Sequence, residues 1–371
     1  MAHAHETILE IDLDALAHNF QYLKSKIDPD TRIMGVVKAF GYGSDAIEVA
    51  KELVTQGVDY FAVAYVKEGV ALRDAGIETP ILVLHPQPNN FEALIDRCLE
   101  PALYSARILR AFIVTAESKS QTNYPVHIKF NTGLNRLGFW ENDVDWIMER
   151  LGETSSVKVT SLFSHLAASE DLSERDFTLG QIGSFKRTAK EMIGKLGYAP
   201  WLHQSNTSAI LNYPEAQFDL VRTGIGLYGY GNSEEEDKKL RPVARLKSVI
   251  SQIHRIEPGE TVGYNRAYTA AHYEQTATLP IGHADGISRQ LGNGKGMVSI
   301  HGKQAPIIGN VCMDMLMVNI TGIDCKEGDE VELIGEIQSA VQLAERMGSI
   351  SYELLTALSQ RVKRVVRRKQ P

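Results

Sequence analysis

The sequence predicts an α/β fold, in which an eight-stranded α/β (TIM-like) barrel is followed by a mostly antiparallel β domain. Short apolar strands alternate with helical patterns eight times over about 220 residues, which is typical of such a barrel. After a charged run at residues 232–239, NSEEEDKK, the apolar period changes to two, which indicates antiparallel strands. We therefore expect two domains, residues 1–240 and residues 241–371. A doubly wound sheet would show the same alternation, but eight units without a break in composition favour the barrel.

The composition is that of an ordinary globular protein. Of 371 residues, 43% are hydrophobic and 23% are charged, so the chain can bury a large core in two domains. The formal net charge of −7 argues against nucleic-acid or membrane-surface binding. Three cysteines without a C-x-x-C indicate a reducing compartment and no metal site. No apolar run approaches the roughly 20 residues that span a bilayer, and no signal peptide is evident. We therefore expect a soluble, cytoplasmic protein.

The expected barrel strands are short apolar runs rich in β-branched residues, as in strands buried on both faces. They cover residues 33–37, 60–64, 81–84, 101–104, 126–130, 159–164, 201–204 and 220–223. A short strand at residues 8–11 and a helix at residues 13–27, capped by Asp12, come before them. The helices between the strands are amphipathic, and glycines at positions 57 and 76 end two of them. They cover residues 44–56, 67–75, 91–98, 106–118, 143–151 and 177–196.

The strands of the second domain show alternating apolar residues, separated by turn signals such as Glu257-Pro258-Gly259. They cover residues 243–250, 276–279, 297–301, 307–308, 315–320 and 330–334. Helices are expected at residues 340–347 and 352–358. The basic tail, RVKRVVRRK, alternates valines with charges, which favours a last strand with a charged face over a nucleic-acid site.

The chain is organised around residues 32–43, RIMGVVKAFGYG. The apolar run stops at Lys38, where the crevice of a barrel or sheet opens. Partial desolvation there lowers the pKa of an amine and makes it a nucleophile toward a carbonyl. Tyr42 adds a hydroxyl near the start of the next helix, where anions bind. On these residues alone, a lysine that points into solvent is the alternative interpretation.

Polar residues follow the later strands, where barrel enzymes carry their chemistry. Arg136 lies in a glycine-bounded loop after the fifth strand and is suited to bind a carboxylate bidentately; a structural salt bridge is the alternative. His165 ends the sixth strand and His203 lies in the seventh, although a lone strand-end histidine is more often hydrogen-bonded than catalytic. Arg222 closes the eighth strand.

The segment after the eighth strand, GIGLYG, matches the dinucleotide motif G-x-G-x-x-G only formally. It closes the α/β region rather than opening it, and no ribose-binding acid follows. Loops after the seventh and eighth strands of a barrel are the usual phosphate site. The amides of Gly224 and Ile225 and the hydroxyl of Thr207, in a helix start with Asn206, are suited to cradle a phosphate.

A lysine nucleophile and a phosphate cradle together indicate pyridoxal 5′-phosphate, bound as a Schiff base. The residue available to face the ring nitrogen is Arg222, because no acid stands at a suitable strand end.

Nine stretches in order make the chain similar to the alanine racemase family, whose members are fold type III pyridoxal-phosphate enzymes. The matching stretches are VVKAFGYG, NTGLNRLGF, SHLA, HQSNTSA, VRTGIGLYG, VGYNRAYTA, IGHADG, GNVCMDM and SYELL. The resemblance covers nearly the whole chain.

The resemblance implies a two-base racemase. Lys38 would hold the cofactor and act as one base, and Tyr264 would act on the opposite face of the α-carbon. In the family this tyrosine comes from the other subunit, so a head-to-tail homodimer with shared sites is implied. A phenol has a reference pKa of about 10 and needs help to act as a base; His203 and Arg222 match a hydrogen-bonded chain behind it. Arg222 would also keep the cofactor ring unprotonated and suppress side reactions.

The resemblance also assigns the remaining binding residues. The phosphate ligands would be Tyr42, Thr207, Gly224, Ile225 and Tyr352, with Asn206 beside them. Arg136 corresponds to the residue that fixes the cofactor phenolate and the substrate carboxylate, and Lys129 to a lysine often carbamylated to orient that arginine. His165 matches the residue beside the ring, Met313 a partner-chain contact to the substrate carboxylate, and Asp314 a supporting residue.

Three departures from the family pattern concern the shape of the substrate channel. Phe40 and Gly41 stand where the family usually has Asn-Ala, Asn131 replaces the common Asp, and His283 replaces a tyrosine that lies along the substrate entrance. The proton-transfer pair is intact.

These observations lead us to expect an alanine racemase that interconverts L- and D-alanine and supplies D-alanine for peptidoglycan. A racemase for serine or several amino acids is the alternative within the fold. A decarboxylase of this fold is disfavoured because such enzymes pair the ring nitrogen with an acid. A non-catalytic pyridoxal-phosphate carrier would resemble the barrel alone, so the second domain counts against it.

Overall fold

The computed structural model describes residues 6–231 and 233–368. Asn232 of the expected linker and Lys369 of the expected tail lie outside these ranges. The chain forms two compact units. The barrel unit consists of residues 16–41 and 46–241, and the β unit of residues 1–15, 42–45 and 242–371, within the described ranges.

The barrel unit contains eight parallel strands in the order β8-β7-β6-β5-β4-β3-β2-β9, as the sequence predicts. Their bounds are β2 Arg32–Val36, β3 Tyr60–Val63, β4 Ile81–Val83, β5 Glu100–Leu103, β6 Tyr124–Lys129, β7 Val157–Phe163, β8 Trp201–His203 and β9 Leu220–Thr223. The ring is joined between its ends by the Arg222 amide, which donates to the Ser205 carbonyl over 3.1 Å. Since the strands are nearly all buried, their apolar runs are explained by helices outside and side chains inside the barrel.

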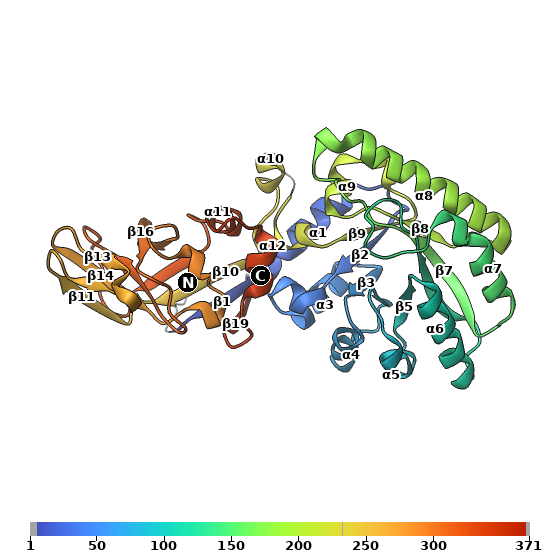
Figure 1. The fold of residues 1–371 in the computed structure, drawn as a ribbon, viewed down its shortest axis with the longest axis horizontal. Coiled ribbons are helices and arrows are strands. Elements are labelled where there is room, and N and C mark those ends of the chain that lie inside the picture. The colour runs from blue at the N-terminus through green and yellow to red at the C-terminus, as the bar shows by residue number, and fades with distance from the viewer. Residues whose placement is uncertain (1–5, 232, 369–371) are drawn as a thin grey trace. The chain divides into compact units, whose positions relative to one another are not determined.

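Helices cover the outside of the barrel strands (Figure 1). They are α3 Ala46–Thr55, α4 Val66–Asp74, α5 Phe91–Asp96, α6 Ala106–Ser118, α7 Val144–Gly152, α8 Arg175–Leu196 and α9 Thr207–Asn212, and α1 Leu13–Lys24 precedes β2. The amphipathic patterns place their apolar faces inward; in α6, for example, Ile108, Leu109 and Phe112 are buried.

The β unit is built on a sheet of order β11-β14-β17-β16-β15-β18-β10-β1-β19. The strands are β1 Ile8–Asp12, β10 Ala244–Val249, β11 Gln252–Ile256, β14 Glu274–Leu279, β15 Met297–Ile300, β16 Lys303–Ile308, β17 Leu316–Asn319, β18 Glu330–Ile334 and β19 Lys363–Arg367. A separate two-stranded ribbon contains β12 Thr261–Val262 and β13 Tyr268–Thr269, and the helices are α11 Ala340–Arg346 and α12 Ser351–Ala357. All pairs are antiparallel except β1 with β19.

Strand β1 differs from the expectation that residues 1–240 form one domain. It pairs with β10 on one side and with β19 on the other. Hydrogen bonding to strands more than 200 residues away therefore draws the start of the chain into the β unit. The apolar periodicity of a strand does not indicate which distant strand it pairs with, so the sequence could not predict this pairing.

Two further segments differ from the sequence prediction. The charged run after Gly231 contains a short helix, α10 Glu234–Asp237, because the Ser233 hydroxyl accepts from the Glu236 amide and caps it. Strand β11 was missed because it is mostly exposed and lacks the apolar alternation that marks a half-buried strand. In the described ranges, no helix combines the length and apolar character needed to cross a membrane.

Candidate active site

The candidate active site begins at Lys38, directly after β2. The chain there makes a turn, α2 Lys38–Tyr42, in which residues 39–42 all have positive φ, between 52° and 63°. The Gly41 amide donates to the Val37 carbonyl over 3.0 Å and closes the turn. Three of these four residues are not glycine, so the conformation is costly and must be held by other contacts.

Glu68 supplies such a contact. Its carboxylate accepts from the Ala39 amide over 2.7 Å, and from the Ala64 and Tyr65 amides over 2.7 and 3.1 Å. Glu68 is the third residue of α4, where an acidic side chain reaches back to the helix start. The same carboxylate thus caps α4 and anchors the turn that carries Lys38.

The Lys38 side chain is half-buried in positive surroundings. Burial lowers the pKa of its amine, the Arg136 guanidinium lowers it further, and Glu68 opposes the shift. This is the direction that the sequence predicts for a strand-end nucleophile. A lysine that loses its proton more readily has a larger neutral fraction near neutral pH, and only the neutral amine can attack a carbonyl or accept a proton.

Lys129, the last residue of β6, is buried beside Phe163, with its Nζ 5.8 Å from the ring centroid. Burial lowers the pKa of Lys129 to about 8, and Arg136 and Arg222 add to the shift. A substantial fraction of this side chain is therefore a neutral amine near pH 8.

The loop that carries Arg136 is organised by Asn131. The Asn131 Oδ1 accepts from the amides of Gly133 (3.2 Å) and Asn135 (2.9 Å), and its Nδ2 donates to the Asn135 side chain over 2.9 Å. A carboxylate could accept the two backbone bonds but could not donate the third. The replacement of the family's Asp is therefore compatible with the loop, and the amide adds a bond of its own.

Arg222, in β9, is the best-anchored charge of the site. Its Nη1 donates to His203 Nδ1 over 2.7 Å, and its Nη2 donates to the Ser164 and Gln204 carbonyls over 2.8 and 3.0 Å and to His165 Nδ1 over 3.1 Å. Burial lowers the pKa of Arg222 to about 9, so the guanidinium remains charged at neutral pH.

Both histidines beside Arg222 are neutral. Burial holds the pKa of each ring well below its usual value, and the Arg222 charge adds to the shift. Their Nδ1 atoms face a guanidinium, which can only donate. Each ring therefore carries its proton on Nε2.

The segments predicted to bind a phosphate meet at Thr207. Its hydroxyl accepts from the Gly224 amide over 3.1 Å and from the Gly226 amide over 3.3 Å. A Cβ at Gly226 would lie 2.6 Å from Thr207 Cγ2, so only glycine allows this approach. Asn206 caps α9, its Oδ1 accepting from the Ala209 amide. Ile225 begins a 3₁₀ turn, Ile225–Tyr228, whose first amides point out of its start.

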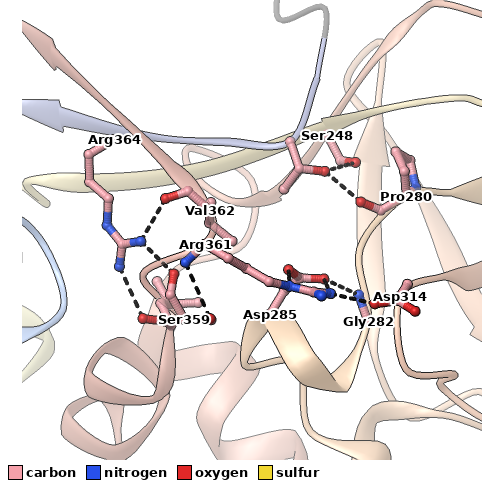
Figure 2. Close-up of polar contacts among 11 residues, drawn as sticks. Ser248, Pro280, Gly282, Asp285, Asp314, Ser359, Arg361, Val362 and Arg364 are labelled. Carbon is pink, nitrogen blue, oxygen red and sulfur yellow. Dashed lines mark hydrogen bonds and ion pairs between the residues drawn. The ribbon is translucent and has the colours of Figure 1, made fainter.

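The other predicted site residues belong to the β unit. Tyr42 is buried, with its ring centroid 5.9 Å from that of Tyr352, and burial and Tyr352 raise its pKa. Tyr264 and Met313 are 74% and 60% exposed. Asp314 accepts from Arg361, which also holds Asp285 (Figure 2).

The structure thus brings one group of predicted residues together in the barrel unit. Arg136 and Arg222 lie close enough to Lys38 and Lys129 to add to the effect of burial and lower the pKa of both amines. Sequence reasoning missed Glu68, although an acid at the third position of a helix is a recognisable capping signal.

This constellation fits an anionic cofactor. In addition to burial, the guanidinium groups of Arg136 and Arg222 lower the pKa values of Lys38 and Lys129. The residues predicted to bind a phosphate lie after β8 and β9, and the amine of Lys38 stands at the end of β2. The barrel and its site define an enzyme of the pyridoxal-phosphate-dependent class.

Comparison with known proteins gives the family. Residues 11–232 match the model of the alanine racemase N-terminal domain and residues 243–366 that of the C-terminal domain. The alanine racemase of Carboxydothermus hydrogenoformans is 36% identical over 365 residues, which cover 96% of this chain and 98% of the relative. The chain belongs to the alanine racemase family.

Solved structures agree with this assignment. The alanine racemase of Clostridium difficile 630 superposes with a TM-score of 0.92 at 36% identity and covers 98% of this chain and 96% of its own. That of Bartonella henselae, solved with covalently bound pyridoxal phosphate, has a TM-score of 0.88 at 30% identity. The match covers 98% of this chain and 100% of the Bartonella henselae chain.

Proposed function

We propose that this protein is a pyridoxal-phosphate-dependent alanine racemase that interconverts L- and D-alanine with two bases, Lys38 and Tyr264. The observation that carries the proposal is the half-buried Lys38 amine with its lowered pKa at the end of β2, in a chain whose two domains both match the family. The match of the second domain also argues against a carrier that consists of a barrel alone.

The cofactor would be held at both ends by residues of the barrel unit. Lys38 Nζ would form the covalent attachment, and the Thr207 hydroxyl with the Ile225 amide would bind the phosphate. The Gly224 amide donates to the Thr207 hydroxyl in this structure and would exchange that bond for one to the phosphate. When bound, pyridoxal phosphate withdraws electrons from the α-carbon of an amino acid and acidifies its proton. Arg222 would face the ring nitrogen. Because a guanidinium can only donate, it would leave that nitrogen unprotonated and restrain side reactions.

Racemisation requires that a proton leave one face of the α-carbon and another arrive on the opposite face. Lys38 would serve one face and Tyr264 the other. The Tyr264 side chain is 74% exposed and that of Met313 60% exposed. We propose that these residues complete the site of a second copy of the chain in a homodimer, where Met313 would contact the substrate carboxylate.

Lys129 is proposed to support Arg136 as a carbamate. A neutral lysine amine can attack carbon dioxide, forming an N–C bond and releasing a proton to solvent, and the product is an anion. The pKa of about 8 supplies the neutral amine near physiological pH, and Arg136 lies close enough to be oriented by the new charge.

The deciding experiment incubates the purified protein, loaded with pyridoxal phosphate, with L-alanine in heavy water and follows D-alanine and α-deuterium together. D-alanine that carries solvent deuterium supports the proposal. Deuterium without inversion contradicts the two-base part, because only one face would then be served. If neither D-alanine nor α-deuterium appears while the cofactor is bound, the alanine racemase assignment is contradicted, and another amino acid or the carrier function is favoured.

A broader racemase is the second candidate, because His283 replaces a tyrosine that lies along the substrate entrance in the family, and Phe40 and Asn131 also depart from the family pattern. Rates on serine, lysine and alanine separate the two, and faster turnover of serine or lysine would favour the second. With alanine as substrate, the product D-alanine would supply peptidoglycan synthesis in the cytoplasm.

A further inference from the structure

A row of polar side chains runs through the barrel interior and ends at Arg222. His203 Nε2 lies 2.8 Å from Ser161 Oγ, Ser161 Oγ lies 2.6 Å from His127 Nδ1, and His127 Nε2 lies 2.7 Å from Glu100 Oε2. The hydroxyl of Tyr60 donates to the same Glu100 oxygen over 2.7 Å. We call Glu100, His127, Ser161 and His203 the buried relay.

The relay is built by adjacent strands. Its members come from β5, β6, β7 and β8, which are consecutive neighbours in the barrel sheet. His127 pairs directly with Ser161 in the β6–β7 register. The two histidines and the serine have no exposed surface, and Glu100 is 9% exposed. Buried polar groups are retained at a cost unless each is hydrogen-bonded.

The direction of every proton in the relay follows from its two ends. Arg222 Nη1 can only donate, so His203 Nδ1 must accept, and His203 carries its proton on Nε2. That proton is donated to Ser161 Oγ, and with a neutral His127 the serine hydroxyl donates to His127 Nδ1. The remaining His127 proton, on Nε2, is donated to Glu100, which accepts it as a carboxylate.

The opposite direction is excluded by geometry. It would place a proton on His203 Nδ1 facing a guanidinium N–H over 2.7 Å, and it would require a protonated Glu100. A doubly protonated His203 meets the same clash, and burial together with the Arg222 charge holds the pKa of that ring well below its usual value. With His127 neutral, one arrangement therefore satisfies all the bonds.

The relay also fixes the plane in which His203 meets Arg222. The ring stacks on Phe163 with centroids 4.8 Å apart and an interplanar angle of 2°. The stack limits tilting of the ring, and the bond from Nε2 to Ser161 stops rotation in its plane. His203 thus presents an oriented lone pair to Arg222 Nη1.

We propose that Glu100, His127 and Ser161 are positioning residues, which fix the tautomer of His203 and through it the guanidinium plane that Arg222 offers to the cofactor. The part that concerns the cofactor rests on the proposed function. The tautomers themselves do not, because they are properties of the protein without cofactor.

The first experiment reads the tautomers directly. Long-range ¹H–¹⁵N correlation spectra of protein labelled in the histidine rings, recorded without cofactor, distinguish the Nδ1-H, Nε2-H and charged forms. His127→Phe and His203→Phe variants assign the two ring signals. Both rings are expected as Nε2-H. An Nδ1-H or charged His203 in the wild-type protein would overturn the proposal, whatever reaction the enzyme performs.

The second experiment tests the effect on the cofactor. Glu100→Leu and Ser161→Ala are expected to lower kcat for alanine roughly tenfold, with little change in KM, and to shift the absorbance of the bound cofactor. Glu100→Gln keeps an oxygen that accepts from His127 and is expected to restore the spectrum and most of kcat.

Tyr60→Phe is the matched control. It removes a buried hydrogen bond to the same Glu100 oxygen that accepts from His127 and is therefore destabilising, but it keeps all four side chains of the relay. If Tyr60→Phe shifts absorbance and kcat as much as Ser161→Ala does, the relay acts only through stability and the proposal fails. If Ser161→Ala changes neither property, it fails as well.

Discussion

Arg361 and Asp285 form a two-point ion pair that joins separate segments of the β unit. Arg361 Nε donates to Asp285 Oδ1 over 2.6 Å and Nη2 donates to Asp285 Oδ2 over 3.0 Å. The same Nη2 donates to Asp314 over 2.7 Å (Figure 2), and Asp285 also accepts from the Gly282 amide. One arginine therefore fixes the loop that presents Met313.

The first prediction concerns this arginine. Arg361→Met is expected to raise KM for alanine between about threefold and tenfold, because a misplaced Met313 would weaken the contact that we propose it makes with the substrate carboxylate. The KM of Arg361→Lys should lie between those of the wild type and Arg361→Met, because an ammonium group keeps the charge but cannot reproduce the planar two-point contact of the guanidinium. Steady-state kinetics measure both. Lys363→Met, which removes an exposed pair with Glu6, is the control; equal effects of the Arg361→Met and Lys363→Met variants would contradict the role.

The second prediction separates the two bases. Lys38→Ala should abolish the absorbance of the covalently bound cofactor and activity in both directions. Tyr264→Phe should keep that absorbance but largely block removal of the α-proton from L-alanine. Spectra and α-proton exchange in heavy water measure these outcomes. Full rates in both directions for Tyr264→Phe would refute the two-base model.

The third prediction follows from the pKa of Lys129, about 8 in the folded protein and 10.5 ordinarily. Below pH 8 the amine is protonated in both states, and the folded state bears the cost of the buried charge. Between pH 8 and 10.5 the folded state has lost the proton while the unfolded state keeps it, so folding is increasingly favoured as pH rises.

Lys129→Met removes the cost of burying the Lys129 charge in the folded state. The cofactor-free variant is therefore expected to be more stable than the wild type at pH 7. The difference in stability between the two proteins, called the gap below, is expected to narrow toward pH 10. Thermal unfolding midpoints in carbon-dioxide-free buffer give the gap. Lys190→Met, at an exposed position on α8, supplies the baseline. A gap independent of pH would show that Lys129 is not perturbed.

The barrel strands were predictable to within two residues at each end, because strands buried on both faces need continuous apolar runs. The buried relay was not. His127, Ser161 and His203 are polar residues inside apolar strands, and that is a signal, but only strand register brings them together. The left-handed turn was also missed, since Ala39, Phe40 and Tyr42 rarely adopt positive φ.

The fourth prediction uses that turn. Phe40 has φ 56° and is 56% exposed, so it bears backbone strain and gains little from burial. Asn tolerates this conformation better than most side chains. Phe40→Asn is expected to raise the unfolding midpoint of the cofactor-free protein by about 1–3 °C. Phe40→Leu keeps the backbone strain and is the control. The hypothesis fails if the two variants have the same unfolding midpoint.

The last prediction concerns Gly282, which packs against the loop of Met313. A Cβ at Gly282 would lie 2.3 Å from the Met313 carbonyl oxygen and 2.4 Å from that of Cys312. Its φ is −149°, so backbone strain plays no part and the clash alone requires glycine. The loop is tied there by the His283 amide, which donates to Cys312 over 2.9 Å, and by the Ala284 amide, which donates to Met313 over 3.0 Å.

Gly282→Ala must push the loop away and weaken both bonds, so we expect a loss of about 1–3 kcal/mol in stability together with a raised KM for alanine. Gly194→Ala is the matched control, because nothing lies within 4 Å of its Cβ position and alanine favours the surrounding helix α8. Melting curves and alanine kinetics of the two variants are compared. A Gly282→Ala variant with wild-type melting would show that the loop yields freely. A Gly282→Ala variant that is destabilised but keeps the wild-type KM would contradict the proposed contact between Met313 and the substrate.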